Sequence, residues 1–453
     1  MTLIRSKLRL HQQFEDKNPS GDPFLTEKTE CISIHIREGG NRIREEWENL
    51  NPECFHIRQR AINMAASGRS SILVLSLLLL AHAIEHTYGA IMPVLFPLIM
   101  DEFSLNYAQI GLLAASYMIT LSFLQLFAGL LTRYIVRKIL IGAGLIWVGL
   151  TTFATGFARG FQELVGIRAL SGAGASMYHP LSGSFLADRF GRSSRGRMMG
   201  LHLGAGNVGS TVAPVLAGCI VLTLGWRATL YVFAVPGLLA GIAFWLLVRE
   251  GTHVDTKMVS VRTSLFKVLK KRETLVLIFV ETLLSFRSSG VGTFLPAYLT
   301  RSLGFEVSVA AAFFSAMYAG SIPGPLALGY LSDHLGRKKV VFCANIVSAL
   351  AIWLLIVGAS PGLILLNLLV LGIAAYSVPA IIQAFLGDVT DPVLRDAAYS
   401  AFFAISMTFG YGLAPAVIGL VIDRFGFLST FGFLGFISIL AALLILSVNE
   451  GLS

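Results

Sequence analysis

Twelve long apolar runs between residues 71 and 447 constrain this sequence more than any other feature. Each is long enough for a helix that crosses about 30 Å of hydrocarbon at about 1.5 Å per residue. Only 13% of the residues are charged, and 55% are hydrophobic, which is more apolar surface than one water-soluble core can bury. Because lipid offers the backbone no hydrogen-bond partners, the runs should be helices. The predicted spans cover residues 71–99, 107–131, 139–158, 161–187, 198–224, 228–248, 274–298, 307–331, 340–358, 363–387, 397–422 and 428–447.

The sequence also repeats itself at a spacing of 200 residues. The segment 129–138 matches the segment 329–338, and each begins with Gly and ends with Arg-Lys. Towards the ends of the two halves the spacing becomes 201, as Gly225 and Gly426 show. Two copies of one membrane-embedded half are typical of secondary transporters, which bind their substrate between the halves.

The repeat and the composition divide the chain into four parts. Residues 1–69 form a polar tail with eleven Lys/Arg and ten Asp/Glu, and residues 249–273 form a basic linker. Between and after them lie two six-helix halves, residues 70–248 and 274–448. The tail lacks an apolar pattern that could form a core, so its composition favours a disordered extension over a regulatory segment.

The positive charge of the chain lies mainly on one side of the predicted membrane. Loops on the side of the N-terminus, with the end of the tail, carry 21 Lys/Arg. The opposite loops carry four, namely Arg159, Arg227, Arg301 and Arg424. This bias predicts that both termini are cytoplasmic, with the spans in the cell (inner) membrane. It also accounts for the net charge of +9 without a nucleic-acid partner.

Titratable side chains within the spans form two lines along helix faces. His82, Glu85 and His86 lie one turn apart in the first span, and Arg168 and His179 lie at nearly the same azimuth in the fourth. An ionised side chain costs about 2.5–3.5 kcal/mol at the centre of a span, so both lines should face the interior of the bundle. We predict that Glu85, His82 and His86 exchange protons, and that Arg168 modulates Glu85 electrostatically.

A second group of polar residues is predicted to bind the substrate. His179 and Tyr178 belong to the fourth span, and Glu281 and Arg287 belong to the seventh. Glu281 and Arg287 are six residues apart and need not pair with each other. His202, in the fifth span, precedes a Gly-rich stretch and is assigned to helix packing.

Two other classes of function remain as alternatives. The segment 82–86 fits H-x-x-E-H, an inverted zincin motif for which Glu163 would be a third ligand, but a protease does not explain the repeat. A membrane sensor that uses the 69-residue tail is the other alternative. The sequence has no G-x-x-x-x-G-K-[ST] motif for ATP, which leaves an ion gradient, and carboxylate beside imidazole favours H⁺. We expect no catalytic residue, metal or cofactor, and a monomer that moves a small molecule and protons across the bilayer.

The segment 329–339 resembles the G-x-L-x-D-x-x-G-R-K/R loop of the major facilitator superfamily. The segment 168–174 resembles a second motif of that family, whose Arg is linked to proton coupling. The resemblance implies a twelve-helix fold in two pseudo-symmetric halves, with Asp333 and Arg337 at a cytoplasmic gate. The residues assigned to gating are Asp333, Arg337, Asp188, Asp388 and Arg133, which replaces the Asp in the first copy of the loop.

Within that superfamily, the first half is similar to the fosmidomycin-resistance exporters. The segments 172–180 and 206–210 carry this similarity, together with residues 102–105. It implies export of a small drug or metabolite by H⁺ antiport, and hence antibiotic resistance. The alternative with the same fold is H⁺-coupled uptake of a small organic anion.

Overall fold

A computed structural model describes residues 52–132, 134–190, 192–248, 268–357, 360–391 and 394–449. Within these ranges the chain is helical and contains no strand. The chain forms two compact units, residues 1–71 and 72–453, and the following concerns the second. Most of the predicted tail and of the linker lies outside the described residues, as does Arg133.

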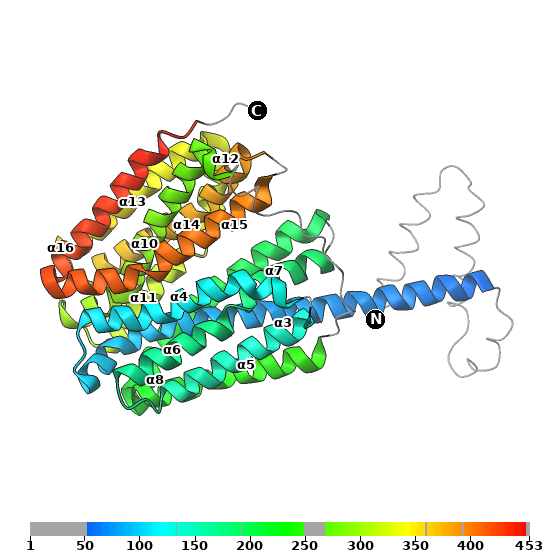
Figure 1. Cartoon of the computed structure of the whole chain (residues 1–453), viewed down its shortest axis with the longest axis horizontal. Coiled ribbons are helices and arrows are strands. Elements are labelled where there is room, and N and C mark those ends of the chain that lie inside the picture. The colour runs from blue at the N-terminus through cyan, green and yellow to red at the C-terminus, as the bar shows by residue number, and fades with distance from the viewer. Residues whose placement is uncertain are drawn as a thin grey trace. The chain divides into compact units, whose positions relative to one another are not determined.

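The first half contains six helices. They are α3 (Pro52–Phe103), α4 (Tyr107–Leu131), α5 (Arg137–Thr155), α6 (Phe161–Ala175), α7 (Tyr178–Arg189) and α8 (Arg192–Leu247). The capping box of Asn106 and Gln109 begins α4. From residue 72 onward these helices pack together as one group in Figure 1.

The second half forms the other group of helices in Figure 1. It contains α10 (Arg272–Arg301), α11 (Val307–Gly320), α12 (Gly324–Leu335), α13 (Arg337–Val357), α14 (Pro361–Val389), α15 (Arg395–Ile405), the π-helix η3 (Ser406–Gly412) and α16 (Ala414–Ile445). A π-helix is rare, and such segments often occur at functional sites.

The helices account for the twelve predicted spans, although the number of helices is smaller than the number of spans. Nine helices of the described ranges are long and apolar enough to cross a membrane. Two of them, Arg197–Leu247 and Ala397–Ile445, each hold two predicted spans that are joined by a turn. The fourth span is divided after Ala175 into α6 and α7, each of which is shorter than a full crossing.

The turn inside each of those two helices is built on a glycine. Gly225 has φ 77° and Gly426 has φ 76°, with ψ of 173° and 172°. An L-residue with a side chain rarely adopts this conformation, which explains why both positions are Gly. The predicted repeat at a spacing of 201 therefore corresponds to the same turn, formed twice.

Close helix contacts also recur at the spacing of the repeat. A Cβ added to Gly172 would lie 2.3 Å from the carbonyl oxygen of Tyr117, so α6 and α4 are in backbone contact. A Cβ added to Gly372 would lie 1.9 Å from the carbonyl oxygen of Met317, which joins α14 and α11. Both partners are 200 residues apart, as the two glycines are. Small residues let membrane helices approach this closely.

We expect Gly372→Ala to destabilise the second half strongly. The added methyl meets a backbone oxygen that no rotamer change can move, so α11 and α14 must separate, at a cost of about 1–3 kcal/mol or more. Thermal unfolding in detergent measures this change. Gly362→Ala is the matched control on α14, because nothing lies within 4 Å of its added Cβ. Equal melting temperatures of the two variants would contradict the contact.

Polar contacts join the two halves at one end of the bundle. Asp423 of α16 accepts hydrogen bonds from the backbone N–H groups of Tyr107 (3.0 Å) and Ala108 (2.8 Å), at the N-terminus of α4. Arg301 of α10 pairs with Asp101 of α3. The charge bias of the loops predicts that this end lies outside the cell.

Asp423→Ala should favour separation of the halves at this end. The carboxylate caps a helix N-terminus in the other half, and loss of such a cap costs about 1 kcal/mol, roughly a fivefold change in population. Distances between one spin label in each half measure the change. Glu163→Ala is the control, because Glu163 caps the N–H of Arg159 (2.9 Å) within the first half alone. If both variants have the distance distribution of the wild type, Asp423 does not hold the halves together.

Candidate functional site

The predicted lines of α3 and of the fourth span meet in the structure. The Glu85 carboxylate lies 3.1 Å from Nε2 of His179, in the first turn of α7, and 3.9 Å from Nε2 of His86. The His82 ring is 4.6 Å from the ring of His86 and 5.3 Å from that of His179, between centroids. These four residues form the histidine cluster, in which one carboxylate is surrounded by three imidazoles.

His202 of α8 adjoins the histidine cluster, which the sequence did not predict. Its ring stacks on that of His82 with centroids 4.0 Å apart. Its carbonyl oxygen lies 2.6 Å from Nδ1 of His82, and because a carbonyl can only accept, His82 Nδ1 carries a proton. The prediction that His202 serves helix packing therefore missed its contact with His82 on α3. One feature of the sequence could have predicted this contact. A histidine in an apolar span is costly, and this applies to His202 as it does to His82.

Arg168 does not contact the histidine cluster directly, and a tyrosine ring lies between them. Its guanidinium lies 4.2 Å from the ring centroid of Tyr117 on α4. Tyr117 is in turn an electrostatic neighbour of the Glu85 carboxylate. Arg168 is 5% exposed, and its Nε has no hydrogen-bond partner among the described residues. The structure therefore places Tyr117 between the two residues that were expected to interact.

The histidine cluster is buried on one side and accessible on the other. The side chain of Glu85 is 7% exposed, whereas those of His86 and His179 are 32% and 39% exposed. A proton or small ion can therefore reach Glu85 through the two accessible imidazoles. Tyr178, which was assigned to the substrate, donates its hydroxyl to the carbonyl oxygen of Leu78 (2.6 Å) and stacks near His82.

The second half contains a buried guanidinium. Arg287 of α10 is 1% exposed. It donates to Asn345 Oδ1 (3.1 Å) on α13, to Ser438 Oγ (3.3 Å) on α16 and to the Ala375 carbonyl (3.4 Å) on α14. All these acceptors are neutral. A buried cation ordinarily has an anionic partner, and Arg287 has none among the described residues.

Glu281 is an electrostatic neighbour of Arg287, but the two form no ion pair in the described part of the chain. Its Oε1 accepts a hydrogen bond from Ser285 (3.5 Å), and its Oε2 has no partner in the described part of the chain. Half-buried tyrosines gather near Arg287: the rings of Tyr318 and Tyr376 are 5.4 Å apart, and Tyr411 is a further neighbour. A guanidinium beside tyrosine hydroxyls suits a carboxylate or phosphonate. We call Arg287, Tyr376 and Tyr411 the arginine group.

The residues assigned to gating are partly described. Arg337 pairs with Asp388 at the end of α14 and lies 3.6 Å from Asp333, one turn earlier in the chain. The Asp333 side chain is 64% exposed, so this second contact is weak. Arg133 lies outside the described residues, and so does the side chain of Asp188.

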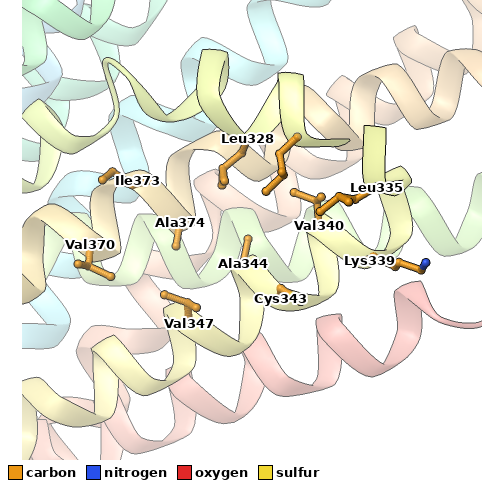
Figure 2. A pocket seen from close by; sticks show the side chains of 11 residues that line it. Leu328, Leu335, Lys339, Val340, Cys343, Ala344, Val347, Val370, Ile373 and Ala374 are labelled. Carbon is orange, nitrogen blue, oxygen red and sulfur yellow. The ribbon is translucent and has the colours of Figure 1, made fainter. Parts of the chain in front are cut away.

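A separate groove on the second half is lined almost entirely by apolar side chains. It has a volume of about 260 Å³ and lies between α12, α13 and α14. Figure 2 shows its lining of aliphatic side chains, including Leu328, Val340 and Val347, with Lys339 at one end. The apolar lining is what a groove open to lipid requires, and none of the predicted site residues contributes to it.

Glu163 is not a third ligand beside the H-x-x-E-H segment. Its carboxylate bonds to the backbone of Arg159 before α6, and His179 takes the place next to Glu85. The segment 82–86 therefore has His179 as its neighbour, whereas the protease alternative required Glu163.

Comparison with known proteins agrees with a transporter. The chain is 24% identical to the cis,cis-muconate transport protein of Acinetobacter baylyi, over 71% of this chain and 80% of that protein. It is 26% identical to the fosmidomycin resistance protein of Escherichia coli, over 79% and 88%. Its fold resembles a bacterial homologue of the lysosomal transporter Spinster, with a TM-score of 0.67, 18% identity and coverage of 83% and 95%.

The sequence also matches the profile of one protein family twice. The matches cover residues 77–286 and 277–451, so each spans nearly all of one of the two halves. The twelve predicted spans, the two-fold repeat and these matches agree. The chain belongs to the Major Facilitator Superfamily, and it is a multi-pass membrane transporter rather than an enzyme.

Proposed function

We propose that the protein couples the movement of protons to that of a small organic anion. The observation that carries the proposal is the division of chemistry between the halves. The first half holds Glu85 among three imidazoles, and the second holds Arg287 without a carboxylate partner in the described residues. The histidine cluster would accept and release the proton, and the arginine group would bind the anion.

Separate sites favour symport. The histidine cluster and the arginine group share neither a residue nor a helix. Proton and anion can therefore be bound at the same time, which symport requires, whereas an antiporter must prevent joint occupancy. Symport corresponds to uptake of the anion down an inward proton gradient. Similarity to a cis,cis-muconate transport protein supports an organic anion as the substrate.

Export by H⁺ antiport is the second candidate. It is favoured by the 26% identity to a fosmidomycin resistance protein, which extends over 79% of this chain. For either direction, Arg337 with Asp333 and Asp388 would hold the gate at the opposite end from Asp423. A gate of this kind would lie on the cytoplasmic side. The protein would be a monomer of the inner membrane, with both termini in the cytoplasm. Reporters fused after Glu450 and within 251–270 test this orientation, and both should read as cytoplasmic.

Flux into proteoliposomes with an imposed pH gradient tests the proposed function. A panel should contain dicarboxylates, sugar acids and phosphonates, each with a neutral amide or ester analogue of the same shape. An inward proton gradient should drive accumulation of at least one anion and none of the neutral analogues. Accumulation of the neutral analogues to the same extent would contradict recognition by Arg287.

A further inference from the structure

The histidine cluster has the composition and spacing of a metal site. One ligand atom from each of His82, Glu85, His86 and His179 lies within 4.8 Å of the other three. Around a tetrahedral zinc ion with bonds of about 2.0–2.1 Å, neighbouring ligand atoms are about 3.3 Å apart. The two distances from Glu85 Oε2, 3.1 and 3.9 Å, bracket that value. Small movements of side chains would therefore complete the site.

The outer contacts of the imidazoles leave the required nitrogens free for a metal. Nδ1 of His82 donates to the carbonyl oxygen of His202, and Nδ1 of His86 lies 3.2 Å from the hydroxyl oxygen of Ser210. Metal-bound histidines usually hold their second nitrogen in this way, which fixes the ring and its tautomer. In His82, Nε2 is then the nitrogen that can offer a lone pair, and the same holds for His86 in the tautomer whose Nδ1 donates to Ser210.

A buried nitrogen without a partner points to the same conclusion. His82 is 1% exposed, and its Nε2 has no hydrogen-bond partner among the described residues. Leaving a buried polar atom unsatisfied costs about 1–3 kcal/mol, so a protein seldom retains one without a use for it. Coordination of an ion would satisfy this atom.

We propose that His82, Glu85, His86 and His179 bind one divalent transition-metal ion of the Zn²⁺ or Co²⁺ class. Three imidazole nitrogens and one carboxylate oxygen suit these ions, whereas Ca²⁺ and Mg²⁺ need mainly oxygen ligands. The accessible rings of His86 and His179 provide the entry path. The ion fastens α3 to α7 and occupies lone pairs of the three imidazoles. This inference goes beyond the proposed function and does not rest on it.

Cobalt titration of the purified full-length protein tests the proposal. The protein is prepared without a polyhistidine tag, treated with a chelator, and titrated in detergent without substrate or a pH gradient. One Co²⁺ per chain should bind with the intense visible absorption of four-coordinate cobalt, and one equivalent of Zn²⁺ should remove that absorption. Ser210→Ala should weaken binding by about 10-fold, because Ser210 supports a ligand without being one.

His179→Gln and Glu85→Gln should lose the four-coordinate spectrum. His334→Gln, on α12 and outside the cluster, should keep it. A spectrum retained in both cluster variants, or only the weak bands of six-coordinate cobalt in the wild type, would overturn the proposal. Circular dichroism and size-exclusion profiles show whether each variant is folded. Because no transport is measured, a failure here leaves proton coupling standing, and a failure of coupling leaves the metal site standing.

Discussion

Glu85→Gln is expected to abolish flux driven by a pH gradient while exchange of substrate across the membrane survives. The amide preserves the size of the side chain and its contact with His179, but it cannot take up or release a proton. Exchange of one substrate molecule for another needs no net proton movement, so counterflow should persist. Glu85→Asp, which restores a titratable group at a shorter length, should recover part of the driven flux.

Glu306→Gln is the matched control for this experiment. Glu306 is exposed at the start of α11, and its side chain makes no cap hydrogen bond, so its removal should leave both kinds of flux unchanged. Undiminished pH-driven flux in Glu85→Gln would show that Glu85 does not carry the coupling proton. Loss of counterflow as well would assign Glu85 to binding of the substrate.

Arg287→Gln should weaken binding of the anion by about 10- to 100-fold, the value of one hydrogen bond to a charged group, about 1.5–3 kcal/mol. Arg287→Lys should be intermediate, because it keeps the charge and loses the planar fork. Equilibrium binding of the transported anion measures the change. Arg424→Gln removes the same charge from an exposed position and should have little effect.

A second measurement separates recognition from folding in the Arg287 variants. Arg287 also links α10 to α13, α14 and α16, so its loss lowers stability. The melting temperature and the size-exclusion profile report on the fold alone. Equal affinity of Arg287→Gln and wild type for the anion would remove Arg287 from the substrate site.

The sequence predicted the features that follow from period and composition. The apolar runs correspond to helices, and the spacing of 200 and 201 residues recurs as the same glycine contacts and turns, at Gly172 and Gly372 and at Gly225 and Gly426. The line of titratable side chains on α3 was predictable because residues three and four apart share a helix face. The cost of charge in lipid predicted that the lines of Glu85 and His179 face the interior of the bundle, but it did not predict that these two side chains meet.

Contacts that depend on how helices rotate against each other were not predictable. His202 joins the cluster and Tyr117 stands between Arg168 and Glu85 because of the packing of α8 and α4, which no local pattern specifies. The bond of Asp423 to the start of α4 joins residues more than 300 positions apart. Such contacts are set by tertiary packing, and spacing in one sequence gives no information about them.

Proton movement caused by the substrate tests the central claim most directly. Proteoliposomes that contain a pH-sensitive dye start with equal pH on both sides, and a gradient of the transported anion is then applied inward. The wild type should acidify the lumen as the anion enters, and Glu85→Gln should not. Entry of the anion into wild-type vesicles without any change of luminal pH would contradict proton coupling.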